Sequence, residues 1–158
     1  MKKHLRNSIF LLLVLLLITG CGCNKKKEKT DKKINEKIEE NVTNMNDEVM
    51  NSLVSIDENM LMTQFGLASN EVEYFVAKIP SYNETKPKFY IAVKPAKGKK
   101  ELVKKALDIY VNSLKDRASE KEKNEYDKVL KKENNGYIIY ILSEDNEKVY
   151  KIITSNLK

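Results

Sequence analysis

A run of ten apolar residues near the N-terminus, residues 9–18, separates a leader from the part of the chain that has to fold. The run follows Lys2, Lys3 and Arg6, and a basic segment before a short apolar run is typical of a secretory signal peptide. A membrane-spanning helix needs about 20 apolar residues, so this run is too short to be one. We therefore expect residues 1–20 to be removed and the remaining 138 residues to form a single domain.

The residues after the apolar run predict a lipid anchor. Ile18, Thr19, Gly20 and Cys21 fit a bacterial lipobox, in which an aliphatic residue and two small residues precede a cysteine. The small residues let a signal peptidase approach the backbone, and the Cys21 thiol is expected to take a diacylglyceryl group. A further acyl chain such as palmitate supplies the second hydrophobic signal that stable anchoring requires. These features predict a location at the cell membrane, on its extracytoplasmic side.

Residues 21–33 are predicted to be a disordered, lysine-rich tether. No apolar side chain occurs in residues 24–33, so nothing there offsets the entropy of folding. The lysines either contact anionic head groups, at about 1 kcal/mol each, or belong to a solvated spacer. Cys23 is either a second thiol near the lipid surface or incidental. Because Cys21 is expected to form a thioether, no intramolecular disulfide is predicted.

Residues 34–158 are predicted to form one α+β domain of two layers, with a three-stranded, mostly antiparallel sheet and about four helices. Apolar residues three or four apart indicate the helices, and alternating or β-branched runs indicate the strands. The expected order is α-β-β-α-α-β-α. The predicted elements are a helix over residues 34–53, strands over 72–79 and 88–94, helices over 99–117 and from 119 to about 134, a strand over 137–142 and a helix over 145–157. The second of the middle helices opens at a capping box and closes at Asn135 and Gly136.

Tyrosines are predicted to form a partner-binding face on the sheet. If Phe89, Ile91 and Val93 face the helices, the period of two along a strand turns Tyr90 to the other side. Tyr74 and one of two later tyrosines join it there, and the candidate face consists of Tyr74, Tyr90 and Tyr140, with Tyr137 as the alternative to Tyr140. Such a face suits a surface protein or a glycan. The alternatives are that tyrosine merely tolerates a half-exposed sheet, or that a helix covers the face.

The composition excludes several kinds of chemistry. The one histidine, His4, lies in the leader, and no cysteine follows Cys23. Pairs of Ser-His and Cys-His nucleophiles, a histidine base and His/Cys zinc sites are therefore excluded from the domain. The five glycines are too scattered for a phosphate-binding loop. We expect no cofactor and no metal.

Nucleic acid is not an expected partner. Removing residues 1–20 lowers the net charge from +6 to +3, because three basic residues and no acidic residue are lost. Arg117 is then the only arginine, whereas proteins that read phosphates or bases use arginine forks.

Two acidic groups were weighed as sites. Glu71 and Glu73 are two residues apart and would share a strand face, so paired-carboxylate chemistry is conceivable. The alternative is a pair of solvent-facing acids at the strand edge. Residues 143–147 offer oxygen ligands for calcium but lack the spacing and central glycine of a calcium loop. A helix N-cap turn is the favoured interpretation of that segment.

Short blocks along the chain resemble the Firmicutes lipoproteins grouped as domain of unknown function 4358. The blocks are Phe-Gly-Leu at residues 65–67, Val-Glu-Tyr-Phe-Val at 72–76, Ile-Pro at 79–80, Phe-Tyr-Ile-Ala-Val at 89–93, Asn-Gly-Tyr-Ile-Ile-Tyr at 135–140 and Ser-Glu-Asp at 143–145. The resemblance covers roughly residues 47–157 and is carried mostly by structural positions. It implies the lipobox, basic tether and opening helix of that uncharacterised family, and no catalytic or binding residues.

The function expected from the sequence is that of a membrane-anchored, non-enzymatic binding or accessory module at the cell surface. One alternative is a solute-capture lipoprotein of a transporter, which the absence of a second lobe disfavours at this length. The other is an enzyme that uses carboxylate, lysine or tyrosine chemistry. Carboxylates that converge in a pocket with perturbed pKa values would favour the enzyme.

Overall fold

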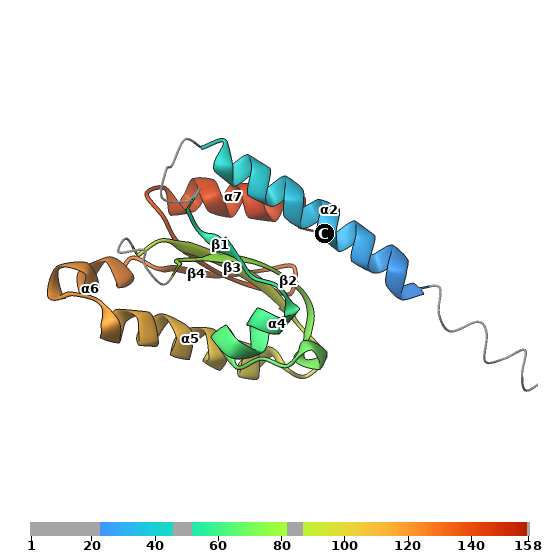
Figure 1. Cartoon of the computed structure of the whole chain (residues 1–158), viewed down its shortest axis with the longest axis horizontal. Helices are drawn as coiled ribbons and strands as arrows, with labels where there is room; N and C mark the ends of the chain where they lie inside the picture. The colour runs from blue at the N-terminus through green and yellow to red at the C-terminus, as the bar shows by residue number, and fades with distance from the viewer. Residues whose placement is uncertain (1–22, 46–51, 82–86, 158) are drawn as a thin grey trace, which may run out of the picture. The chain divides into compact units, whose positions relative to one another are not determined.

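The computed structural model describes residues 23–45, 52–81 and 87–157. The predicted signal peptide, the lipobox and Cys21 lie outside these residues. Contacts divide the chain into two compact units, Met1–Ile34 and Asn35–Lys158. The sheet and its covering elements belong to the second unit, and their arrangement can be followed in Figure 1.

One antiparallel sheet organises the second unit. Its strands are β1 (Val54–Ser55), β2 (Val72–Ile79), β3 (Phe89–Pro95), β4 (Leu130–Asn134) and β5 (Tyr137–Leu142). They lie in the order β1-β2-β3-β5-β4, and every neighbouring pair is antiparallel. The predicted α+β class and the antiparallel pairing of the strand at 137–142 are confirmed. The sheet has five strands rather than the predicted three, because β1 and β4 were not predicted.

The helices surround this sheet in chain order. They are α2 (Cys23–Thr43), α4 (Glu58–Met60), the π-helix η1 (Leu61–Phe65), the 3₁₀-helix η2 (Ser69–Glu71), α5 (Lys100–Arg117), α6 (Glu120–Tyr126) and α7 (Asn146–Asn156). The predicted capping box is present, since the Glu122 carboxylate accepts hydrogen bonds from the Ser119 backbone N–H at 3.1 Å and hydroxyl at 2.6 Å. Gly66, at φ +67°, ends η1 in the left-handed region, as its place after the apolar segment predicted.

The chain between α6 and β5 differs from the prediction. A helix was expected to run to Asn135 and Gly136, but α6 ends at Tyr126 and β4 begins at Leu130. Asn135 and Gly136 have φ values of +49° and +83°, and they join β4 to β5. Two left-handed residues between antiparallel strands form the hairpin turn that Asn-Gly favours most strongly. The dipeptide therefore closes a hairpin and not a helix.

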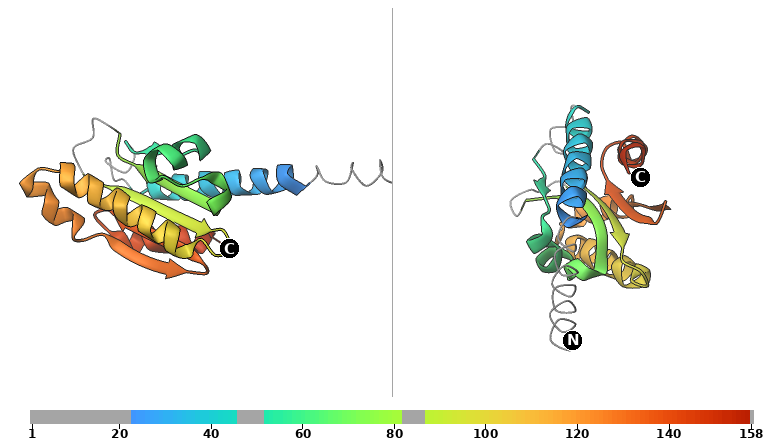
Figure 2. Two further views of the ribbon diagram at one scale, coloured as in Figure 1. Left: turned by 90° about the horizontal axis from the view of Figure 1, so that it is seen from below. Right: turned by 90° about the vertical axis from the view of Figure 1, so that its right-hand side faces the viewer.

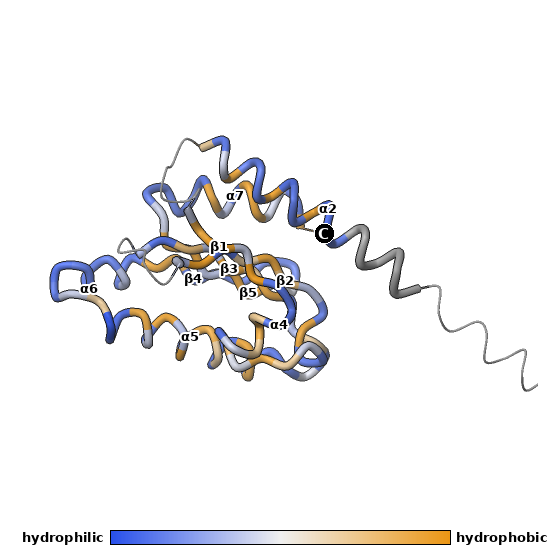
Figure 3. The backbone as a smooth tube through the Cα atoms, viewed as in Figure 1, coloured by the Kyte–Doolittle hydropathy of each residue, from blue (hydrophilic) through white to orange (hydrophobic). Residues whose placement is uncertain are grey.

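Both faces of the sheet are covered, so the predicted two layers are in fact three. On one face, the buried side chains of Phe89, Ile91 and Val93 pack with Val103 and Leu107 of α5, as predicted. The opposite face is also buried and is covered by α7 and residues 35–43 of α2. Figures 1 and 2 show α5 and α7 on opposite sides of the sheet, and Figure 3 shows apolar residues recurring along both helices. The buried side chains outside the α5-side core include Ile38, Tyr90, Ala92, Ile139, Ile141, Val149 and Ile153.

The predicted tether is helical where the structure describes it. Residues 23–33 form the first half of α2, which continues without a break to Thr43. The prediction of disorder was wrong because it weighed only the lack of apolar side chains. The segment has no glycine or proline, and lysine and glutamate are good helix formers. The helix predicted over residues 34–53 ends ten residues early, and residues 46–51 lie outside the described part.

Candidate functional site

The predicted tyrosine face is buried and does not form an open surface. Tyr74, Tyr90 and Tyr140 are 8%, 0% and 2% exposed. The period of two placed Tyr90 correctly on the side away from α5. Tyr140, however, lies opposite Ile91 in the β3–β5 register, so its side chain is on the α5 side of the sheet. The proposed face therefore fails twice, because it is covered and because its members lie on different faces.

The segment of α2 over residues 35–43 covers this tyrosine side through polar as well as apolar contacts. The Tyr74 hydroxyl donates to the Asn35 side-chain oxygen, and the Asn35 amide donates to the Phe75 carbonyl at 3.3 Å. Glu39 lies 3.5 Å from the Lys78 ammonium and accepts a hydrogen bond from a β1 serine at 3.0 Å. These contacts attach the helix to the outer strands of the sheet.

Tyr90 has an unusual hydroxyl. It is fully buried, and it has no hydrogen-bond partner among the residues that the structure describes. Burial raises the pKa of this phenol well above its usual value, and the nearby Glu39 charge and Tyr74 raise it further. Tyr90 is therefore neutral at physiological pH, and its hydroxyl stabilises nothing that the structure describes.

On the α5 face, the β4–β5 hairpin carries a compact group of a lysine, a tyrosine and a carboxylate. The Lys131 ammonium lies 5.0 Å from the centre of the Tyr140 ring and 2.7 Å from Asp108 Oδ1. The Tyr140 hydroxyl donates to the same carboxylate oxygen at 2.8 Å. We call Lys131, Tyr140 and Asp108 the first lysine cluster.

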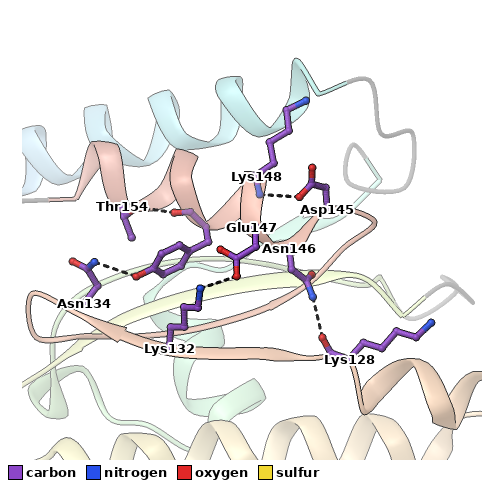
Figure 4. A network of polar contacts seen from close by, with 9 residues as sticks. Lys128, Lys132, Asn134, Asp145, Asn146, Glu147, Lys148 and Thr154 are labelled. Atoms are coloured by element: carbon purple, nitrogen blue, oxygen red, sulfur yellow. Dashed lines mark hydrogen bonds and ion pairs between the residues drawn. The ribbon is translucent and has the colours of Figure 1, made fainter.

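The next residue of β4 makes the same arrangement on the opposite face. The Lys132 ammonium lies 4.5 Å from the centre of the Tyr150 ring and 2.7 Å from Glu147 of α7. The Tyr150 hydroxyl accepts a hydrogen bond from the Asn134 amide at 3.1 Å. Figure 4 shows Lys132 and Glu147 pointing toward each other between β4 and α7. We call Lys132, Tyr150, Glu147 and Asn134 the second lysine cluster.

The electrostatics of these groups favour fixed charge states at neutral pH. Burial tends to raise the pKa of Asp108, but hydrogen bonds from Lys131 and Tyr140 and the nearby lysine charges outweigh it, so the pKa lies below its usual value. Burial, followed by the hydrogen bond to Asp108, raises the pKa of Tyr140. The hydrogen bond from Lys100 lowers the pKa of Glu133. The acids are thus charged and the tyrosine is neutral, which suits cohesion better than proton transfer.

The two predicted carboxylates do not converge. Glu71 belongs to η2 and not to a strand, and it accepts from the Ala68 backbone N–H at 3.0 Å and the Lys99 ammonium at 3.2 Å. The backbone hydrogen bond is the main cause of its lowered pKa. Glu73 is exposed on β2 and lies 3.5 Å from the Lys94 ammonium. Each acid is thus tied to a different lysine.

The acidic segment at residues 143–147 is a helix cap, as favoured from the sequence. The Asp145 carboxylate accepts from the Lys148 backbone N–H at 2.9 Å and caps α7. The Asn146 side-chain oxygen accepts from the Ser143 N–H at 2.7 Å. Over residues 23–45, 52–81 and 87–157, no three histidine, cysteine, aspartate or glutamate side chains are grouped as metal ligands would be.

Comparison of the chain with protein-family models, with curated proteins and with solved structures finds no significant match. Within the described ranges, no helix combines the length and apolar character needed to cross a membrane.

The lysine clusters were not predicted, although the sequence carries a signal for them. Once Asn135 and Gly136 are taken as a hairpin turn, the preceding residues must pair with β5, and alternate side chains of β4 fall on opposite faces. Lys131 and Lys132 then necessarily face different layers. The partners on α5 and α7 could not be inferred, because they depend on how the helices pack.

Proposed function

We propose that this protein is a lipoprotein anchored at the extracytoplasmic side of the bacterial cell membrane, and that its globular domain is a non-enzymatic binding or accessory module. The observation that carries the anchor is the succession of a basic segment, a short apolar run and the lipobox ending at Cys21. Acylation of that cysteine would hold the domain at the membrane surface. The resemblance to domain of unknown function 4358 agrees with this location and belongs to the same proposal.

The non-enzymatic role is supported by the state of the ionisable groups in the domain. Burial raises the pKa values of Tyr90, Tyr110 and Tyr140, while hydrogen bonds from lysines lower those of Asp108 and Glu133. Both kinds of group are thereby moved away from neutrality, whereas an acid–base catalyst works best with a pKa near the operating pH. A role in contact with a surface protein or a glycan requires no such tuning.

The anchor is tested by replacing each cysteine near the lipobox in the full-length chain. Cells that express the wild type, Cys21→Ser or Cys23→Ser are labelled with a fatty acid that carries an alkyne, and the protein is then followed in membrane and soluble fractions. Loss of label and of processing in Cys21→Ser alone is the expected result, and Cys23→Ser is the matched control. Normal labelling and membrane retention of Cys21→Ser would disprove the anchor.

A further inference from the structure

One edge of the sheet is a short strand with a distinctive charge pattern. Among the described strands, β4 has a neighbour on one side only, which is β5. Asn134 pairs with Tyr137 across the two-residue turn, and such a turn is closed by a pair that exchanges hydrogen bonds. Because these pairs alternate along an antiparallel ladder, Lys132 also bonds to β5, while the N–H and C=O groups of Lys131 and Glu133 point outward.

We propose that a second copy of this chain pairs with the outward edge of β4, antiparallel and about a two-fold axis at Lys132. In this register the outward groups of Lys131 meet those of Glu133 of the second copy, and the reverse pair is generated by the symmetry. The sheet then continues from one copy into the other. This assembly is independent of the proposed lipid anchor, because it uses only the edge of the folded domain.

Charge selects this register over its neighbours. An axis at Lys132 brings each Lys131 opposite a Glu133, and opposite charges directly across an antiparallel pair contribute roughly 0.2–1 kcal/mol. An axis at Lys131 or at Glu133 instead places like charges opposite each other. A shift by one residue would require the N–H and C=O groups of Lys132, which already bond to β5. Only the register centred on Lys132 therefore satisfies both the hydrogen bonds and the charges.

Lysines on an edge strand usually oppose such pairing, and two Lys132 side chains meet at the proposed axis. Each of them, however, lies 2.7 Å from a Glu147 carboxylate and over a Tyr150 ring, so the axis is approached by ion pairs and not by free cations. On the α5 face, Glu133 is 2.6 Å from Lys100 and 3.5 Å from Lys104, while Lys131 lies on Asp108. These partly exposed ion pairs can exchange with their counterparts in the second copy at little cost.

A cysteine at the proposed axis tests the geometry. Cα atoms in a non-hydrogen-bonded antiparallel pair are about 4.5 Å apart, which is within the range that a disulfide spans. The full-length chain is used with Cys21 and Cys23 replaced by serine and Lys132→Cys added, and it is oxidised in mild detergent. A disulfide-linked dimer is expected. Lys151→Cys, at an exposed position on α7, is the matched control and should remain monomeric. Equal cross-linking of the two variants would overturn the proposal.

Charge reversal tests the register and does not require every variant to be equally stable. Because the edge is short, we expect a weak dimer in sedimentation velocity, with a Kd of about 1–100 μM. Glu133→Lys or Lys131→Glu alone should weaken self-association by roughly tenfold, since two attractive pairs become repulsive. A mixture of the two variants should associate as well as the wild type, because lysines then face only glutamates. Glu40→Lys, an exposed change on α2, should have no effect.

Two results contradict this inference. One is a full-length chain that stays monomeric up to about 1 mM. The other is a dimer whose Kd does not respond to the reversals at Lys131 and Glu133 although circular dichroism shows both variants to be folded.

Discussion

The hydroxyl of Tyr90 is the residue-scale feature that sequence reasoning and the structure describe most differently. The sequence placed this side chain on an exposed surface, whereas it lies fully buried between β3 and the segment of α2 over residues 35–43. A buried hydroxyl without a hydrogen bond costs about 1–3 kcal/mol relative to one that is paired. Its ring, by contrast, fills space that no smaller side chain would fill.

We predict that Tyr90→Phe leaves the free energy of unfolding unchanged or raises it by about 1 kcal/mol, because the ring is kept and the unpaired hydroxyl is removed. Tyr90→Ala should lower it by about 3–5 kcal/mol through loss of packing. Tyr74→Phe is the matched control, since that hydroxyl donates to Asn35, and it should cost about 1 kcal/mol. Urea denaturation measures all three. A loss above 1 kcal/mol in Tyr90→Phe would mean that the hydroxyl is bonded in solution.

At the scale of elements, the Asn135–Gly136 turn decides the sheet edge. Both residues have positive φ, and an added Cβ at Gly136 would meet nothing closer than Lys94 Cε at 4.0 Å. Space therefore does not require glycine at this position. The backbone conformation does, since a side chain in the left-handed region costs roughly 1–2 kcal/mol.

Gly136→Ala is accordingly predicted to lower the free energy of unfolding by about 1–2 kcal/mol. Asn135→Gly changes the same turn but keeps a residue that adopts positive φ readily, so its effect should stay within about 0.5 kcal/mol. Thermal or urea denaturation of the two variants compares them directly. Equal stability of Gly136→Ala and the wild type would show that the turn is not held in this conformation.

The elements that could be predicted are those with a strong pattern of their own. β2, β3, β5 and α5 were found because alternating or amphipathic runs of six or more residues specify them locally. β4 was missed because Leu130 is its single apolar residue and Asn-Gly is compatible with both a helix end and a hairpin. β1 has two residues, too few to carry a period. Its position depends on pairing with β2, a contact distant in sequence.

At the scale of the whole domain, the sequence did not reveal which sheet face each helix covers. The apolar stripes of α5 and α7 show that each buries one side, but both faces of β3 and β5 are apolar enough to receive them. The predicted site failed for this reason, since Tyr74 and Tyr90 belong to the second covered face. The chemical exclusions drawn from histidine and cysteine do not depend on packing, and they stay as predictions about function.

Residues 35–43 of α2 contribute to the second core out of proportion to their number. Ile38 and Val42 are 0% and 2% exposed, while Asn35 and Glu39 bond to the outer strands. Full burial of an aliphatic side chain is worth about 1.5–3 kcal/mol. Removing this segment would also expose Tyr90, so it belongs to the folded domain and not to the tether.

Truncation separates the two halves of α2. A chain that begins at Asp31 should melt at the same temperature, within about 2 °C, as one that begins at Cys21, because the residues removed contribute no apolar side chain after Cys23. A chain that begins at residue 44 should melt at least 10 °C lower or fail to fold, since a loss of a few kcal/mol shifts the melting point of a domain of this size by about that much. Scanning calorimetry of the three chains at one protein concentration provides the comparison. If the chain from Asp31 melts several degrees lower, residues 21–30 stabilise the domain, whereas an unchanged melting point for the chain from residue 44 would mean that α2 is not part of the core.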